Sequence, residues 1–194
     1  AIVVNCAYPR NSTGTAIADG LQYIQRAFES AVEGKALAII NISSQSVYSQ
    51  LRTDAATEDT PVCLESPYAV GKYAVELMLE SICRGSRTSF VNLRMASLIG
   101  PGFDQRIVNR FAAKLLHREP VAIIRQDKRM GFLDVEDAVS AVMAVAEHAA
   151  DIRGTVYNVG NGQSYTAEAI YNAVAESLKG RTDVLEPVME DGTE

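Results

Sequence analysis

The stretch that decides the fold runs from residue 36 to residue 95. It opens with ALAIINIS (36–43), passes through a polar segment that ends in Ser66-Pro67, and closes with TSFVNLRM (88–95). The first and last pieces are continuous apolar runs, a pattern typical of strands buried on both faces of a parallel sheet. Ser66 and Pro67 form an N-cap followed by proline at the first helical position, which predicts a helix over residues 67–83.

The same alternation extends on both sides of this stretch. Residues 1–7 (AIVVNCA) form another apolar run rich in β-branched residues, and residues 17–33 carry apolar residues at helical spacing up to Gly34. Buried strands that alternate with helices predict right-handed crossovers and a parallel α/β sheet. Further along, we expect helices at 104–117, 136–149 and 166–179, strands at 121–125 and 155–159, and a loop or tail over 185–194.

Composition excludes several classes of protein. The 194 residues carry 18 Lys+Arg and 24 Asp+Glu, a net charge of −6 that disfavours binding to nucleic acid. No apolar run reaches the roughly 18 residues needed to span a bilayer. The three cysteines are irregularly spaced, which favours reduced thiols in the cytoplasm, and with only two histidines the sequence argues against a zinc site.

A glycine-rich phosphate turn, G-x-G-x-x-G, normally follows the first strand of a nucleotide-binding sheet. The sequence contains no such turn, and its nearest candidates, Gly100-Pro101-Gly102 and Gly160-Asn161-Gly162, come late in the chain. We therefore expect the sequence to begin inside the fold, with the glycine-containing half of the sheet upstream of it.

Tyr68 and Lys72 are the strongest local signal for chemistry. Four residues apart on a helix, they lie one turn apart on the same face. An ammonium beside a phenol favours the phenolate and lowers a pKa that is ordinarily about 10, which makes tyrosine a usable acid or base near neutral pH. A helical wheel puts this pair with Val75 and Leu79, away from the main apolar stripe of the helix. Taken alone, the spacing also fits an exposed tyrosine beside a solvated lysine.

A series of short patterns in order carries a resemblance to a known family. Residues 40–49 read INISSQSVYS at the end of a predicted strand, and Ser66-Pro67-Tyr68 and Lys72 open the helix. Leu93-Arg94 and Gly100-Pro101-Gly102 follow. The last two patterns are FLDVED (132–137) and VYNVG (156–160). This series, which covers nearly all of the chain, resembles the NAD-dependent epimerase/dehydratase family of the extended short-chain dehydrogenase/reductase superfamily.

The resemblance implies a Rossmann-like doubly wound parallel sheet and a set of roles. Residues 1–100 would be the later part of the NAD(P)-binding domain, and residues 101–194 mostly a small α/β substrate-binding portion with some segments that return to the sheet. Tyr68 would be the general acid/base, Lys72 would lower its pKa and bind the nicotinamide ribose, and Ser44 would hydrogen-bond the reacting oxygen. The cofactor would be NAD or NADP, with NAD favoured, and its binding would also involve Cys6, Ala7, Ser43, Ser97 and Leu98.

The implied substrate is a nucleotide sugar, bound by Ser44 and Ser97 together with Arg106 and Arg129. Ser97 and Met130 stand where nucleotide-sugar members usually have asparagine and arginine. The pair Gln45-Ser46 lacks the carboxylates of the family's dehydratases, which favours an epimerase or simple oxidoreductase over a 4,6-dehydratase.

Three further expectations complete the sequence analysis. One alternative activity is an NADPH-dependent carbonyl reductase acting on a small non-nucleotide substrate. The other alternative is a non-catalytic module that senses the cofactor. We also expect a homodimer through helices 17–33 and 67–83, with Val75 and Leu79 on the outward side.

Overall fold

The computed structural model describes residues 1–9, 14–52, 54–125, 129–152 and 154–191. The chain divides into two compact units, which are described separately. The first unit contains Ala1–Ala96 and Glu136–Val159, and the second contains Ser97–Val135 and Gly160–Glu194.

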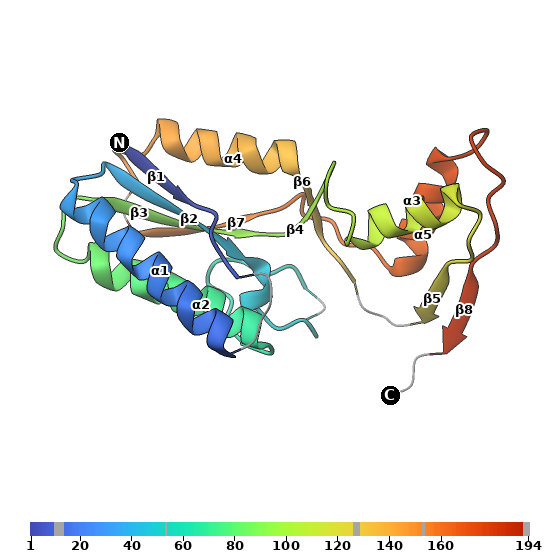
Figure 1. Cartoon of the computed structure of the whole chain (residues 1–194), viewed down its shortest axis with the longest axis horizontal. Helices are drawn as coiled ribbons and strands as arrows, with labels where there is room; N and C mark the ends of the chain where they lie inside the picture. The colour runs from blue at the N-terminus through green and yellow to red at the C-terminus, as the bar shows by residue number, and fades with distance from the viewer. Residues whose placement is uncertain (10–13, 53, 126–128, 153, 192–194) are drawn as a thin grey trace. The chain divides into compact units, whose positions relative to one another are not determined.

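The first unit is a parallel sheet covered on both faces. Its strands follow the order β1-β2-β3-β7, and every neighbouring pair is parallel. The helices α1 and α2 cover one face, and α4 covers the other (Figure 1). The bounds are β1 (Ile2–Asn5), α1 (Gly14–Glu33), β2 (Ala38–Ser44), α2 (Pro67–Cys83), β3 (Ser89–Met95), α4 (Val135–Glu147) and β7 (Thr155–Val159). The predicted doubly wound parallel α/β fold is confirmed.

The side chains beneath α1 and α2 change in character along the strands. Strand register groups them into three rows: Val3, Ile39 and Phe90; Asn5, Asn41 and Asn92; and Ser43, Arg94 and Asn158. The first row packs into the apolar core between the sheet and the two helices. The amides of the second row bond to one another across the strands, at 2.9 Å from Asn5 to Asn41 and 2.8 Å from Asn41 to Asn92. Polarity therefore rises toward the carboxyl ends of the strands, where open α/β sheets bind ligands.

The face that α2 buries corrects the wheel prediction. Val75 and Leu79, expected on the outward side, are 2% and 0% exposed and belong to the core, whereas Val70 and Leu77 are 49% and 50% exposed. The prediction was wrong because α2 is apolar on several sides, and the face that carries Lys72 and Glu76 is the one that packs against the sheet. Both charges are buried, because the sheet supplies partners for them.

Within its described residues, the second unit contains two short parallel strand pairs and two helices. The strands β4 (Ser97–Ile99) and β6 (Phe132–Asp134) pair with each other, and β5 (Ala122–Arg125) pairs with β8 (Val188–Asp191). The helices α3 (Ile107–Leu116) and α5 (Ala167–Ser177) pack around one apolar core that includes Phe111, Leu115 and Tyr171. In the described part of the chain, no helix is both long enough and apolar enough to cross a membrane.

Strand β8 contradicts the predicted tail over 185–194. Val188 donates its backbone N–H to the carbonyl of Val121 at 2.9 Å, and Met189 packs against the core of the second unit. The segment is too short and acidic to predict a strand alone, and it becomes one because β5 offers an open edge. Residues 192–194 lie outside the described residues.

Candidate active site

Helix α2 begins where the sequence predicts. The Ser66 hydroxyl accepts a hydrogen bond from the N–H of Ala69 at 3.2 Å, and Pro67 occupies the first turn. This cap fixes the start of the helix, so Tyr68 lies in its first turn and Lys72 lies one turn later on the same face. Tyr68 keeps 37% of its surface exposed, whereas Lys72 keeps 7%.

Lys72 is buried against the end of β2. Its Nζ donates to the carbonyl oxygen of Ile42 at 2.8 Å and lies 5.9 Å from the centre of the Tyr68 ring. Burial lowers the pKa of Lys72 to about 8, although the nearby Cys6 and Glu76 act in the opposite direction. The side chain therefore carries its positive charge at neutral pH and can lose it under mildly alkaline conditions.

Ser44 is the last residue of β2, two positions after Ile42. It caps the short helix η1 (Gln45–Val47), and its Oγ accepts hydrogen bonds from the N–H of Ser46 at 3.2 Å and from the Ser46 hydroxyl at 2.9 Å. Its own hydroxyl proton is used in neither bond. Because successive residues of a strand are about 3.3 Å apart, Ser44 lies at the same end of β2 as the Lys72 ammonium.

The residues that follow β1 also lie near the Lys72 ammonium. Cys6 is exposed, and the N–H of Ala7 donates to the side chain of Asn5 at 3.2 Å. The small Cys6 and Ala7 side chains leave room for a ligand beside the end of this strand. The Lys72 ammonium has three hydrogens, of which the bond to Ile42 uses one, so it can also bind ribose hydroxyls. These residues fit a nicotinamide cofactor.

Tyr8 lies beside Tyr68 and Lys72, and it was not among the site residues predicted from the sequence. Its ring meets the Tyr68 ring edge to face with centres 5.1 Å apart, and its hydroxyl donates to the backbone carbonyl of Tyr68 at 3.3 Å. Its ring centre is 4.6 Å from Lys72 Nζ. Burial and the neighbouring Tyr68 raise the pKa of the Tyr8 phenol, so it stays protonated. The signal in the sequence was an aromatic residue just past a buried strand, at the end where ligands bind.

A second polar cluster lies under α2. The guanidinium of Arg94 binds the Glu76 carboxylate through Nη2 at 2.7 Å and through Nε at 3.1 Å, with both side chains at most 6% exposed. The Ser43 hydroxyl donates to the same carboxylate. On the other side, Arg94 donates to the Tyr48 hydroxyl at 2.8 Å, and Tyr48 donates to Asn158 at 2.9 Å. These hydrogen bonds connect β2, α2, β3 and β7 to one another.

The pKa of Arg94 and the place of Ser43 follow from this cluster. Burial acts against the charge of Arg94, but the hydrogen bonds and charge of Glu76 and the Tyr48 hydroxyl outweigh it and raise the pKa of Arg94 above its ordinary value. These contacts give Arg94 a structural role, because they hold β3 to α2. The Ser43 hydroxyl donates its proton to Glu76, so it is not available as a donor for the predicted cofactor contact.

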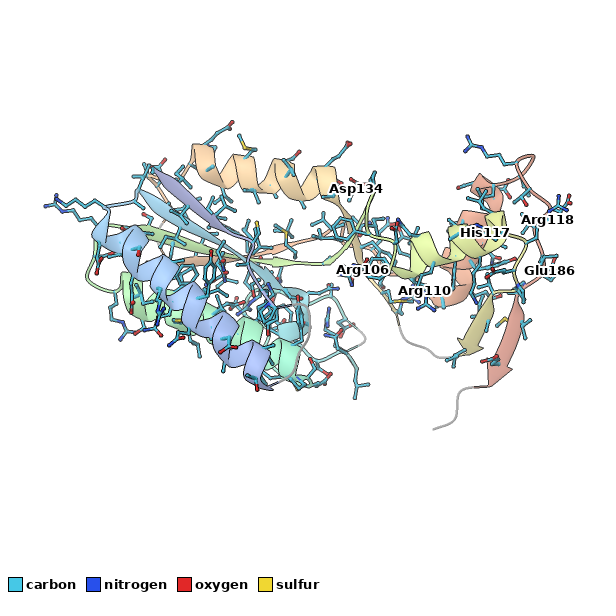
Figure 2. All side chains as sticks on the ribbon, in the orientation of Figure 1. Arg106, Arg110, His117, Arg118, Asp134 and Glu186 are labelled. Atoms are coloured by element: carbon cyan, nitrogen blue, oxygen red, sulfur yellow. The ribbon has the colours of Figure 1, made fainter. Side chains whose placement is uncertain are left out.

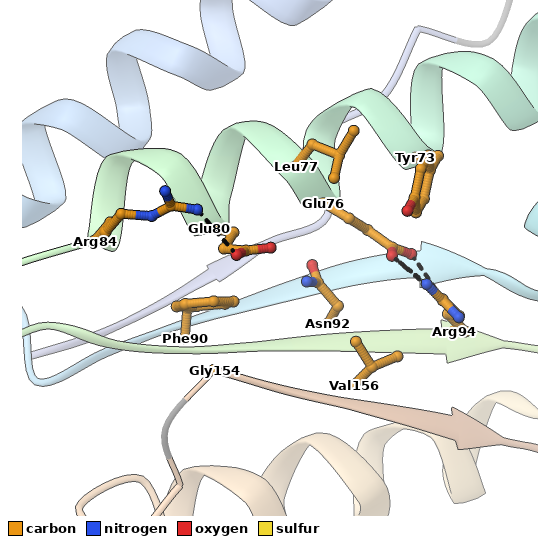
Figure 3. Close-up of a pocket in the computed structure, with 10 residues that line it drawn as sticks. All are labelled: Tyr73, Glu76, Leu77, Glu80, Arg84, Phe90, Asn92, Arg94, Gly154 and Val156. Carbon is orange, nitrogen blue, oxygen red and sulfur yellow. Dashed lines mark hydrogen bonds and ion pairs between the residues drawn. The ribbon is translucent and has the colours of Figure 1, made fainter. Parts of the chain in front are cut away.

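The Glu76–Arg94 pair also borders a pocket of about 440 Å³ between α2, β3 and β7 (Figure 3). Leu77, Phe90 and Val156 contribute apolar walls to it. Neither Ser44 nor Tyr68 nor Lys72 lines this pocket, so it is separate from the catalytic candidates of the first unit.

The remaining predicted residues belong to the second unit. Ser97 and Leu98 lie in β4, opposite Phe132 and Leu133 of β6. Arg106 is exposed at the start of α3 (Figure 2). Arg129 donates from Nε to the Ser164 hydroxyl and from Nη2 to the Ser164 carbonyl, both at 3.0 Å. The structure thus groups the predicted catalytic residues with Cys6, Ala7 and Ser43 in the first unit, and Ser97, Leu98 and the two arginines in the second.

The chain is similar in sequence to several curated proteins. The chain is 22% identical over 172 residues to the low-salt glycan biosynthesis protein Agl12 of Haloferax volcanii, a match that covers 88% of this chain and 55% of the relative. It is 24% identical over 179 residues to a dTDP-glucose 4,6-dehydratase of Streptomyces antibioticus, covering 91% of this chain and 53% of the relative. The chain therefore spans about half the length of the curated relatives it matches.

Solved structures agree on the fold. MoeE5, determined in complex with UDP-glucose and NAD, superimposes with a TM-score of 0.83 and 27% identity, over 99% of this chain and 65% of MoeE5. The UDP-N-acetylglucosamine 4-epimerase of Bacillus cereus gives a TM-score of 0.87 at 23% identity, over 98% of this chain and 65% of that enzyme. Residues 2–160 match the family described as the NAD dependent epimerase/dehydratase family, and the chain belongs to this family.

Proposed function

We propose that this protein is an NAD-dependent enzyme that acts on a hydroxyl-bearing carbon of a nucleotide sugar, with Tyr68 as its general acid/base. One observation carries the proposal: Tyr68 and Lys72 lie one turn apart on α2, and the Lys72 ammonium is bonded to the carbonyl of Ile42, two residues before Ser44. A phenol, an ammonium and a hydroxyl at the end of one parallel strand suit proton transfer at a sugar hydroxyl. We also propose that residues 1–100 serve mainly the cofactor and residues 101–194 mainly the substrate.

Each residue would do a separate part of the work. Tyr68 would exchange a proton with the substrate hydroxyl through its phenol oxygen. Lys72, positively charged below a pKa of about 8, would stabilise the phenolate that remains and hold the ribose hydroxyls of the cofactor. Ser44 would donate its unused proton to the reacting oxygen and stabilise negative charge there. Bound NAD would supply the hydride acceptor and donor. Cys6, Ala7, Ser97 and Leu98 would line its binding site.

For the substrate we propose a sugar linked to a nucleoside diphosphate, because one relative is named a dTDP-glucose 4,6-dehydratase and MoeE5 was determined in complex with UDP-glucose. Exposed Arg106 and Arg129 would bind the phosphates, and Ser97 would contact the sugar. Positions 45 and 46 carry glutamine and serine, and without a carboxylate there the site favours epimerisation or simple oxidation over elimination of water.

The test compares two tyrosine variants. We would titrate the protein with NAD and NADP by calorimetry, and follow UDP-glucose, UDP-N-acetylglucosamine and dTDP-glucose by proton NMR. Tyr68→Phe should abolish nearly all turnover while it keeps cofactor affinity. Tyr23→Phe, a change at a tyrosine that is 65% exposed on α1, is the matched control and should leave both unchanged. Full activity of Tyr68→Phe would refute the proposed role, and cofactor binding without turnover of any sugar nucleotide would favour a cofactor-sensing module. Turnover of small carbonyl compounds with NADPH would favour a reductase.

We further propose a homodimer through α1 and α2. Tyr23 on α1 and Val70 and Leu77 on α2 expose large apolar side chains, 65%, 49% and 50% of their surfaces, and they replace Val75 and Leu79 as the outward apolar residues. Sedimentation at micromolar concentration should give twice the mass of the chain, and Leu77→Glu should give the monomer mass. A monomeric parent protein would refute this interface.

A further inference from the structure

A buried ammonium needs partners, and Lys72 has few. On its own helix it faces Tyr68 and Glu76, from β2 it receives the Ile42 carbonyl, and from the segment after β1 it faces Cys6 and Tyr8. The Glu76 carboxylate already accepts hydrogen bonds from Arg94 and Ser43. Among the residues that the structure describes, the Ile42 carbonyl and the Tyr8 ring are therefore the contacts that hold the ammonium in place.

Tyr8 is fixed on two sides. Its hydroxyl donates to the Tyr68 carbonyl, and its ring packs edge to face with the Tyr68 ring. Position 71, on the next turn of α2, is a glycine, and a Cβ atom there would overlap the Tyr8 hydroxyl. The missing side chain at Gly71 thus provides the space that lets Tyr8 lie against α2. With its hydroxyl anchored in this way, the ring face lies 4.6 Å from Lys72 Nζ, within the distance of a cation–π contact.

We propose that Tyr8 is a positioning residue of this site: its ring face holds the Lys72 ammonium beside the end of β2, and its hydroxyl fixes that ring to the first turn of α2. This inference rests on the proposed function for its catalytic consequence, since Lys72 supports the Tyr68 phenolate only while it is charged and in place. The contact itself is a property of the folded chain and can be tested without any turnover.

The ring face and the hydroxyl make separable contributions. Tyr8→Phe loses the hydroxyl contact with the Tyr68 carbonyl, but the edge-to-face contact with the Tyr68 ring remains and should keep the ring over Lys72. Tyr8→Leu keeps an apolar cover, so Lys72 stays shielded from water, but it removes the aromatic face that favours the charged form. We therefore expect Tyr8→Leu to lower the pKa of Lys72 by about one unit from its value of about 8, and Tyr8→Phe to change it by less than about 0.3 unit.

The experiment is an NMR titration of the lysine ε-methylene signals in the purified chain, with the Lys72 signal assigned by its loss in Lys72→Arg. Thermal unfolding confirms that each variant is folded. A Leu variant that titrates like the parent protein, or a Phe variant that shifts as far as the Leu variant, would overturn the proposal. If Tyr8→Leu does not fold, Tyr8→Met provides the same comparison, because it also covers Lys72 without an aromatic face.

Activity then separates this inference from the proposed function. If the chain turns over a sugar nucleotide, the alkaline limb of its pH–rate profile should move to lower pH by about one pH unit in Tyr8→Leu and stay in place in Tyr8→Phe. A shift in the titration without turnover of any sugar nucleotide would support the positioning role and count against the proposed function. Turnover of a sugar nucleotide with an unshifted pKa of Lys72 would support the proposed function and count against the positioning role.

Discussion

Arg94→Met would remove the positive charge from the buried ion pair under α2 and leave the Glu76 carboxylate in place. Methionine fills much of the same volume, so the change isolates the charge and its hydrogen bonds from the packing. In the native structure that carboxylate accepts bonds from Arg94 Nη2 at 2.7 Å and from Arg94 Nε at 3.1 Å. In the variant it keeps only the Ser43 hydroxyl among these donors.

The expected loss follows from burial. Glu76 is 4% exposed and Arg94 6%, and removing one partner of a buried pair typically costs about 3–5 kcal/mol. For a chain of this size, that corresponds to a fall in Tm of about 6–20 °C. Glu76→Gln keeps an acceptor for Arg94 and Ser43 and should cost about 2–3 kcal/mol. In the double variant neither charge remains, so its loss should be smaller than the sum of the single losses by about 2 kcal/mol.

The assay is urea unfolding of the four proteins, followed by circular dichroism. Arg84→Met is the matched control, because Arg84 and Glu80 form an ion pair on the same helix with side chains 77% and 53% exposed. Its loss should stay below about 0.5 kcal/mol. Additive losses for Arg94→Met and Glu76→Gln, or a loss for Arg94→Met no larger than the control, would refute the view that the two charges stabilise the sheet as a unit.

Three further outcomes follow from single positions. Relative to Lys72→Met, the parent protein should gain about 3 kcal/mol of stability between pH 8 and pH 10.5, because the unfolded lysine keeps its proton in that range and the folded one, with a pKa of about 8, releases it. Urea unfolding of both proteins at several pH values measures this slope. A stability difference between them that does not change with pH would contradict the prediction. Asn41→Leu removes the acceptor of the Asn5 amide N–H and the donor to the Asn92 carbonyl, and should lower stability by about 2–3 kcal/mol in thermal unfolding. A loss near zero would mean that these two groups find other partners. A change from glycine to alanine normally stabilises a helix by about 1 kcal/mol. Gly71→Ala should instead destabilise this protein, because the new Cβ overlaps the Tyr8 hydroxyl, and it should do so less in a Tyr8→Phe background. Equal effects in the two backgrounds would disprove that contact.

Local pattern was sufficient for the order of most elements and for the placement of Tyr68 and Lys72 one turn apart on α2. Ser66-Pro67 predicts the start of α2 to the residue, and the four-residue spacing of Tyr68 and Lys72 puts both on one face. The apolar runs identify β2 and β3 as buried parallel strands. These features depend on residues within one or two helical turns, or on the two-residue period of a strand, so a single sequence contains them. Strand β1 is parallel as predicted, but it is only partly buried, with Val4 42% exposed, so the prediction of a buried strand there was wrong.

Only the tertiary structure decided which face of α2 is buried, what Lys72 contacts and whether residues 188–191 form a strand. Tyr8 meets Tyr68 across 60 residues of chain, Glu76 meets Arg94 across 18, and β8 forms because β5 has an open edge. No local pattern reports such contacts. A buried charge looks like a surface charge in sequence until the register of neighbouring strands brings its partner within bonding distance, and that register is set by the packing of the whole sheet.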